Sequence, residues 1–203
     1  MRPYLLVACL ALGIPLAADA QPRDYSERSL ALLPGWCKYA QDFRDRVPGG
    51  NNPAEYQRLM TITKGMFQHM HHHCYGLIAQ NTAMLRVRDP QKRAALLKTS
   101  VNEFDYVLRN TPPDFIMLPE VLTKRAESLI ALTRGAEAQS DLQRALQLKP
   151  DYWPAWLTLA DYYYEKVGDA AKAAYTLEQG IVAAPNAPAL QDRLAELKGA
   201  KRR

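Results

Sequence analysis

The chain has 203 residues, a formal net charge of +5 and a sequence pI near 9.1. Hydrophobic residues make up 48% of it, which is enough to form a packed core within one domain. The positive charge predicts a weak attraction to anionic surfaces. It is dispersed apart from the basic C-terminal end, and no stripe of alternating aromatic and basic residues is present, which argues against a nucleic-acid site.

Residues 1–20 have the pattern of a secretory signal peptide. Arg2 precedes an apolar stretch, and Ala18-Asp19-Ala20 has the small-x-small form of a cleavage site. The pattern predicts export, and the short signal with a single basic residue favours a bacterial periplasm. Cys9 ends a lipoprotein-like Leu-Val-Ala-Cys run, but the apolar stretch before it is too short for lipidation to be favoured. No later stretch approaches the roughly 18 apolar residues that span a bilayer, so no transmembrane segment is expected.

The segment that follows, 21–52, is expected to form an N-terminal capping helix and a loop. Pro34 can open a helix over 34–46, on which three aromatic residues have helical spacing: Trp36, Tyr39 and Phe43. Residues 47–52 read Val-Pro-Gly-Gly-Asn-Asn and predict a loop.

A long helix and a divergent helical hairpin are expected over 53–112. Pro53 begins the helix, and a mostly apolar stripe runs from Tyr56 to Met84, with Gly65 as the place where it bends. Asp89 caps the next helix, which breaks at Thr111 before two prolines. No period-2 pattern of strands is present, so the predicted fold is all-α.

The segment 151–186 carries the most informative pattern. Its first helix places large, large, small and large residues on one face, and its second places small, large and small residues before Pro185, with a Gly168-Asp169 turn between them. Small residues let two helix backbones approach, while large ones fill the flanking grooves. The two series are Trp156, Leu159, Ala160 and Tyr163, followed by Ala173, Leu177 and Gly180.

A similar unit precedes it over 113–150. It ends at Pro150, a spacing close to a roughly 34-residue period, although Arg125 occupies a position where a large apolar residue is usual. Its packing positions are Leu122, Ala126 and Leu129, then Ala138, Leu142 and Ala145. These two units resemble the tetratricopeptide repeat (TPR). The one departure in the last unit is an extra residue before the turn at Gly168.

The resemblance implies a solenoid of helical hairpins, closed by a capping helix and basic tail over 187–203. It also implies a concave groove, lined by the first helices of successive repeats, that receives a protein or peptide partner. Carried over by position, the groove residues are Glu120, Thr123, Glu127, Leu157, Asp161, Tyr164 and Glu165. The four acidic residues among them predict a ligand of basic character. Ordinary solvated helix faces are the alternative.

All four histidines of the chain lie between Met66 and Cys74. His, Met and thiolate are copper ligands, and His with Cys suits zinc, so a periplasmic metal-binding protein is the alternative function. Its ligands would be Met66, His69, Met70 and His73. Against this, the Met residues fall on the stripe needed for the core, which leaves His69 and His73 at the border of the core.

Two cysteines, Cys37 and Cys74, remain after removal of the leader, and both lie on apolar helical faces. An oxidising compartment predicts a disulfide between them, with two buried free thiols as the alternative. A tight hairpin would leave them too far apart. The loop over 47–52 must therefore run back along the next helix, or that helix must break near Gly65.

Catalysis is not expected. The sequence has no glycine-rich phosphate loop, no G-x-S-x-G, no C-x-x-C and no H-E-x-x-H motif. The preferred interpretation is therefore an exported scaffold without a cofactor, which binds a protein or peptide partner of the cell envelope.

Overall fold

The computed structural model describes residues 25–200, and the expected signal peptide, Cys9 and residues 201–203 lie outside this range. All regular structure among the described residues is helical, which confirms the predicted all-α class. None of their helices is long and apolar enough to cross a membrane. The elements are α1 (Glu27–Leu30), the 3-10 helix η1 (Gly35–Tyr39), α2 (Pro53–Ile62), the 3-10 helix η2 (Met66–His69), α3 (Met70–Leu85), α4 (Pro90–Asn110), α5 (Leu118–Ala131), α6 (Gly135–Leu148), α7 (Trp153–Asp161), the π-helix η3 (Tyr162–Val167), α8 (Ala170–Ala183) and α9 (Pro188–Ala200).

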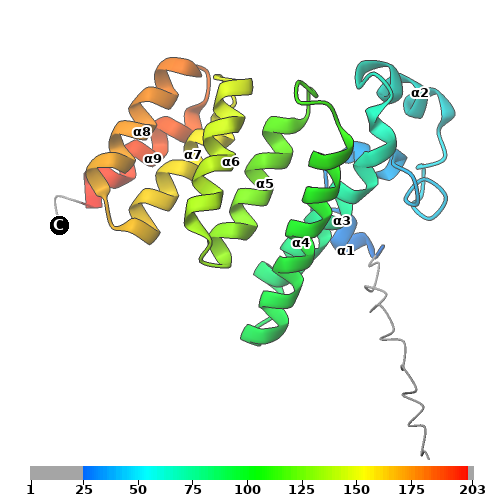
Figure 1. Cartoon of the computed structure of the whole chain (residues 1–203), viewed down its shortest axis with the longest axis horizontal. Coiled ribbons are helices and arrows are strands. Elements are labelled where there is room, and N and C mark those ends of the chain that lie inside the picture. The colour runs from blue at the N-terminus through cyan, green and yellow to red at the C-terminus, as the bar shows by residue number, and fades with distance from the viewer. Residues whose placement is uncertain (1–24, 201–203) are drawn as a thin grey trace, which may run out of the picture.

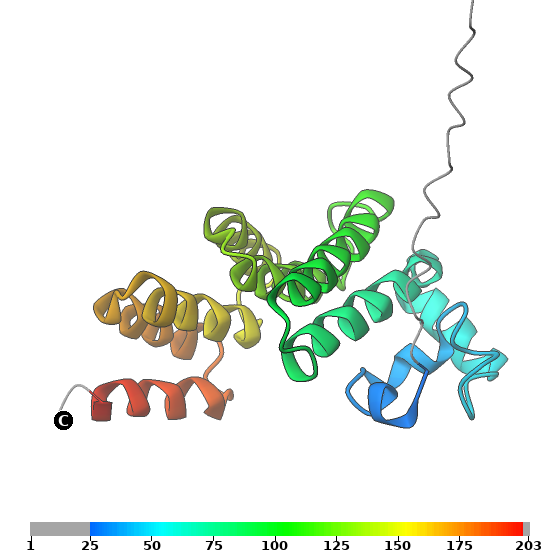
Figure 2. The same ribbon diagram turned by 90° about the horizontal axis from the view of Figure 1, so that it is seen from below.

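From α3 to α9 each helix packs against the next one along the chain, and α5 also contacts both α3 and α7. The helices therefore form a row of hairpins, α3–α4, α5–α6 and α7–α8, with α9 at its end (Figure 1). Seen from the perpendicular direction, the hairpins lie at different angles, so that the row is not flat (Figure 2).

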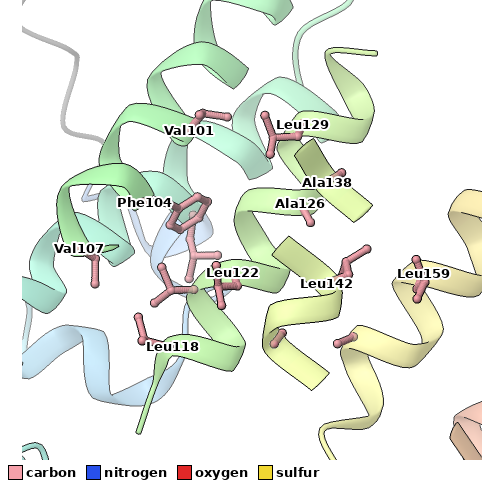
Figure 3. Packing of buried hydrophobic residues seen from close by; sticks show 14 of the residues in the cluster. Val101, Phe104, Val107, Leu118, Leu122, Ala126, Leu129, Ala138, Leu142 and Leu159 are labelled. Carbon is pink, nitrogen blue, oxygen red and sulfur yellow. The ribbon is translucent and has the colours of Figure 1, made fainter. Parts of the chain in front are cut away.

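One core runs through the row. Phe104 of α4, Leu122 of α5 and Leu142 of α6 are fully buried and lie in successive layers (Figure 3). The small residues predicted at the helix crossings are also buried: Ala126, Ala138, Ala145, Ala160 and Ala173. Small side chains at these points let the helix axes approach while Leu and Phe fill the space on either side.

The prediction of an N-terminal helix over 34–46 is wrong. The segment forms the short η1 and then turns, because Ala40 has an extended backbone and Asp42 a φ of 68°, neither of which continues a helix. Phe43 is nevertheless fully buried, in edge contact with the ring of Tyr25. The aromatic positions were therefore found correctly, but the backbone reaches them without a helix.

The long helix expected after Pro53 is broken at the glycine where a bend was predicted. α2 ends at Ile62, and Lys64 and Gly65 have φ values of 50° and 87°. The chain restarts as η2 and then α3, which brings Cys74 to Cys37. The predicted disulfide is confirmed, with the two Cα atoms 5.9 Å apart. Of the two routes considered for this pairing, the break at Gly65 is the one that the structure takes.

The extra residue before the turn at Gly168 is accommodated by the π-helix η3. The wider i→i+5 turn absorbs one residue, and Gly168 ends it in the left-handed conformation with a φ of 76°. The turn closes with a hydrogen bond from Asp169 N to Tyr163 O at 2.9 Å. Such turns occur frequently at functional sites.

Candidate binding groove

A groove of about 820 Å³ opens across three of the helical hairpins. It is lined by the end of α3, the first half of α4, the last turn of α5, the second half of α7, and η3. Its volume falls within the range of about 300–1,000 Å³ that is typical of ligand sites. The apolar part of the lining consists of Met84, Pro90, Ala94, Leu97, Ile130, Ala131 and Leu157.

Four of the seven residues expected in a concave groove lie in this one: Glu127, Leu157, Asp161 and Glu165. They come from α5 and from the consecutive elements α7 and η3, which α6 separates in sequence. Packing of α5 against α7 brings them together.

The other three expected residues lie elsewhere. Thr123 is fully buried, and its hydroxyl donates to the carbonyl of Pro119 at 2.7 Å, so it is a packing residue. Glu120 faces His73 of α3, with Oε1 3.1 Å from Nε2. Tyr164 packs beneath the guanidinium of Arg193 from α9, because the π-turn alters the angular spacing on which its prediction depended.

The acidic side chains of the groove are already paired. Glu127 accepts from Lys124 Nζ at 2.8 Å, and Asp161 accepts from Arg193 Nε at 2.7 Å. Glu165 lies 3.6 Å from the same guanidinium. Burial raises the pKa of Glu127, and Lys124 opposes this increase. The acidic residues therefore contribute less free negative charge than their number suggested.

The basic side chains of the groove are Arg88, Arg93 and Lys166, which sequence reasoning did not identify. All three are exposed, and within residues 25–200 none forms an ion pair or a side-chain hydrogen bond. Arg93 belongs to the first turn of α4, the second helix of its hairpin, and Arg88 lies just before that helix. The resemblance places only first helices at the groove, so it gave no reason to inspect this helix.

The two histidines of the metal hypothesis, His69 and His73, have different surroundings. His73 is fully buried, stacked on Trp36 and next to Phe104. His69 and His72 instead contact Tyr106, and His72 Nδ1 pairs with Glu103. Burial, with a smaller effect of His72, lowers the pKa of His69.

The remaining ligands of the metal hypothesis are also constrained by packing. Met70 is fully buried and Met66 is partly buried against the core. Cys74, beside them, is engaged in the disulfide. Across the part of the chain that the structure describes, no three His, Cys, Asp or Glu residues are arranged to hold a metal ion.

Comparison of the chain with protein-family models, with curated proteins and with solved structures gives no match. No relative therefore assigns a role to any residue.

Proposed function

We propose that this chain is an exported, non-catalytic binding module of TPR-like architecture, which holds a segment of a protein partner in the groove between α4, α5 and α7. The observation that carries the proposal is the groove itself. Its lining combines apolar side chains with charged ones, which is the composition of a surface that binds another polypeptide.

The rigidity of the elements around the groove supports the same conclusion. α4, α5 and α7 are fixed by core residues such as Leu97, Leu129 and Leu159, which are almost fully buried. A groove built on packed helices keeps its shape without a ligand, so a partner segment loses entropy on binding but the groove does not.

Export is supported by the disulfide. A bond between Cys37 and Cys74 persists in oxidising compartments and is rare in the cytosol. We propose the periplasm as the compartment, and a role in assembling or positioning envelope proteins as the context of binding.

A groove-filling variant tests the proposal. Ala94 lies half-buried in the groove on α4, and Ala171 is an exposed alanine on α8 outside it. Peptides selected from a displayed random library on the wild-type protein should bind Ala94→Phe at least about tenfold more weakly, equivalent to about 1.4 kcal/mol. They should bind Ala171→Phe as they bind wild type. Equal binding to wild type and Ala94→Phe would place the binding surface elsewhere and refute the proposal.

A further inference from the structure

We infer that the segment held in the groove is acidic, with apolar residues between its carboxylates. This inference rests on the proposed function and reverses the basic ligand expected from the sequence. The cations that would receive the carboxylates are Arg88, Arg93 and Lys166.

The sign of the ligand's charge follows from which charges of the groove already have a partner inside the molecule. Lys124 pairs with Glu127, and Arg193 contacts Asp161 and Glu165 as well as Glu196, so each acidic side chain of the lining already has a cationic partner from outside it. The lining's own cations have no acidic partner within residues 25–200. A basic ligand would have to compete with Lys124 and Arg193, whereas an acidic ligand meets cations that are free to pair.

The positions of the cations fit a peptide lying across the groove. Arg88 and Arg93 belong to the α4 side, and Lys166 belongs to the η3 side, with α5 packed between α4 and α7. Lys166 lies within the π-turn that the extra residue creates. The departure from regular helix geometry therefore places a cation at the groove.

The apolar lining residues of the groove favour a polypeptide over a nucleic acid. Met84, Ile130 and Leu157 offer apolar side chains to the ligand, and Tyr162 is the aromatic residue among the lining residues that the structure describes. Binding of single strands depends on several aromatic side chains that stack successive bases. A peptide with alternating carboxylates and aliphatic side chains matches both the basic and the apolar residues of the lining.

The test uses three labelled peptides, in which Leu alternates with Glu, with Lys or with Ser, and fluorescence anisotropy with the whole mature protein. The groove variant is Arg88→Gln/Arg93→Gln/Lys166→Gln. Its matched control, Lys98→Gln/Arg109→Gln/Arg144→Gln, removes the same charge from exposed residues outside the groove. The Glu–Leu peptide should bind wild type and the control equally, and the groove variant about tenfold or more weakly.

The two proposals fail in different ways. If Ala94→Phe abolishes binding of all peptides but the groove variant retains the Glu–Leu peptide, the groove is a binding site and the acidic ligand is refuted. Tighter binding of the Lys–Leu peptide refutes it as well. If a single-stranded oligonucleotide competes as well as the Glu–Leu peptide, the cations serve polyanions in general and the peptide is refuted. If Ala94→Phe changes no binding, the proposed function itself falls.

Discussion

Tyr162 lies directly over Gly135: a Cβ atom at Gly135 would be 2.3 Å from the Tyr162 hydroxyl oxygen. Gly135 begins α6, and Tyr162 lines the groove from η3. The absence of a side chain at one helix start therefore sets the position of an aromatic side chain in the groove. A methyl group here would meet the free end of a half-buried ring, which can rotate away.

We therefore expect Gly135→Ala to change the groove and leave the fold nearly intact. Tyr162 must shift, while Ala favours the helical conformation over Gly by up to about 1 kcal/mol. The free energy of unfolding in urea should equal or slightly exceed that of wild type, while the affinity for library-selected peptides changes. An unchanged affinity would show that the position of Tyr162 is irrelevant to binding.

Gly180→Ala should instead destabilise the fold. A Cβ atom there would lie 2.8 Å from Trp156 Cβ and 3.1 Å from Leu190 Cδ1. Trp156 Cβ is attached to the backbone and cannot rotate away, so α7 and α8 must separate. Overpacking of this kind costs about 1–3 kcal/mol, which for a chain of this size lowers Tm by roughly 2–12 °C. A Tm equal to that of wild type would show that this crossing is not tightly packed.

The sequence was most informative where helices cross. The size pattern that includes Ala160 and Gly180 predicted which residues are buried, because small residues at a crossing have few alternative explanations. Gly65 marked the place where the long helix breaks, and Gly168 marked the turn before α8. Whether a glycine bends a helix or breaks it depends on tertiary contacts, which periodicity does not contain.

Charge pairing was the least predictable feature of the groove. Glu127 and Asp161 line the groove, but their partners Lys124 and Arg193 lie one turn away and on α9 respectively. The sequence gives the number of charges and does not say which are neutralised within the fold. The expectation of a basic ligand depended on that missing information.

Loss of the disulfide should destabilise the N-terminal segment strongly. Cys37 and Cys74 are 37 residues apart, and closing a loop of this length stabilises the fold by about 3–4 kcal/mol in the chain-entropy model. The free energy of unfolding in urea should be lower by this amount in Cys37→Ser/Cys74→Ser than in wild type. Alkylation of the unreduced, unfolded wild-type protein followed by intact-mass measurement provides the control: labelling of both thiols would contradict the bond.

Arg125 joins three helices in place of the apolar residue usual at its position. Its Nε lies 2.6 Å from Asp105 Oδ1 of α4, and its Nη1 lies 2.8 Å from Asp141 Oδ2 of α6. Arg125→Met removes the ion-pair partner of both carboxylates and should cost about 2–3 kcal/mol, because both are partly buried.

The matched variant Asp105→Asn/Arg125→Met/Asp141→Asn removes all three charges. Its free energy of unfolding in urea should return most of the way to the wild-type value, because no unpaired carboxylate remains. If the triple variant is no more stable than Arg125→Met, the loss arises from packing of the Arg125 side chain and not from its charge.

Glu120 should make stability depend on pH through its contact with His73. Burial raises the pKa of Glu120, but the hydrogen bond and the electrostatic interaction with His73, together with the charge of Lys124, lower it more, so that the net pKa lies below the ordinary value of 4.5. A carboxyl group with a lowered pKa in the folded state stabilises the fold above the pKa of the unfolded state. That contribution is lost as the pH falls through the folded-state pKa.

Glu120→Gln should therefore be less stable than wild type by about 1–2 kcal/mol at neutral pH, the usual cost of losing a partly buried charged hydrogen bond. The difference should stay constant down to about pH 4.5 and shrink below it. Glu178→Gln, which removes an exposed carboxylate paired with Lys198, is the control and should differ little from wild type at any pH. A Glu120→Gln difference that persists unchanged at pH 3 would mean that the carboxylate charge does not stabilise the contact between α3 and α5.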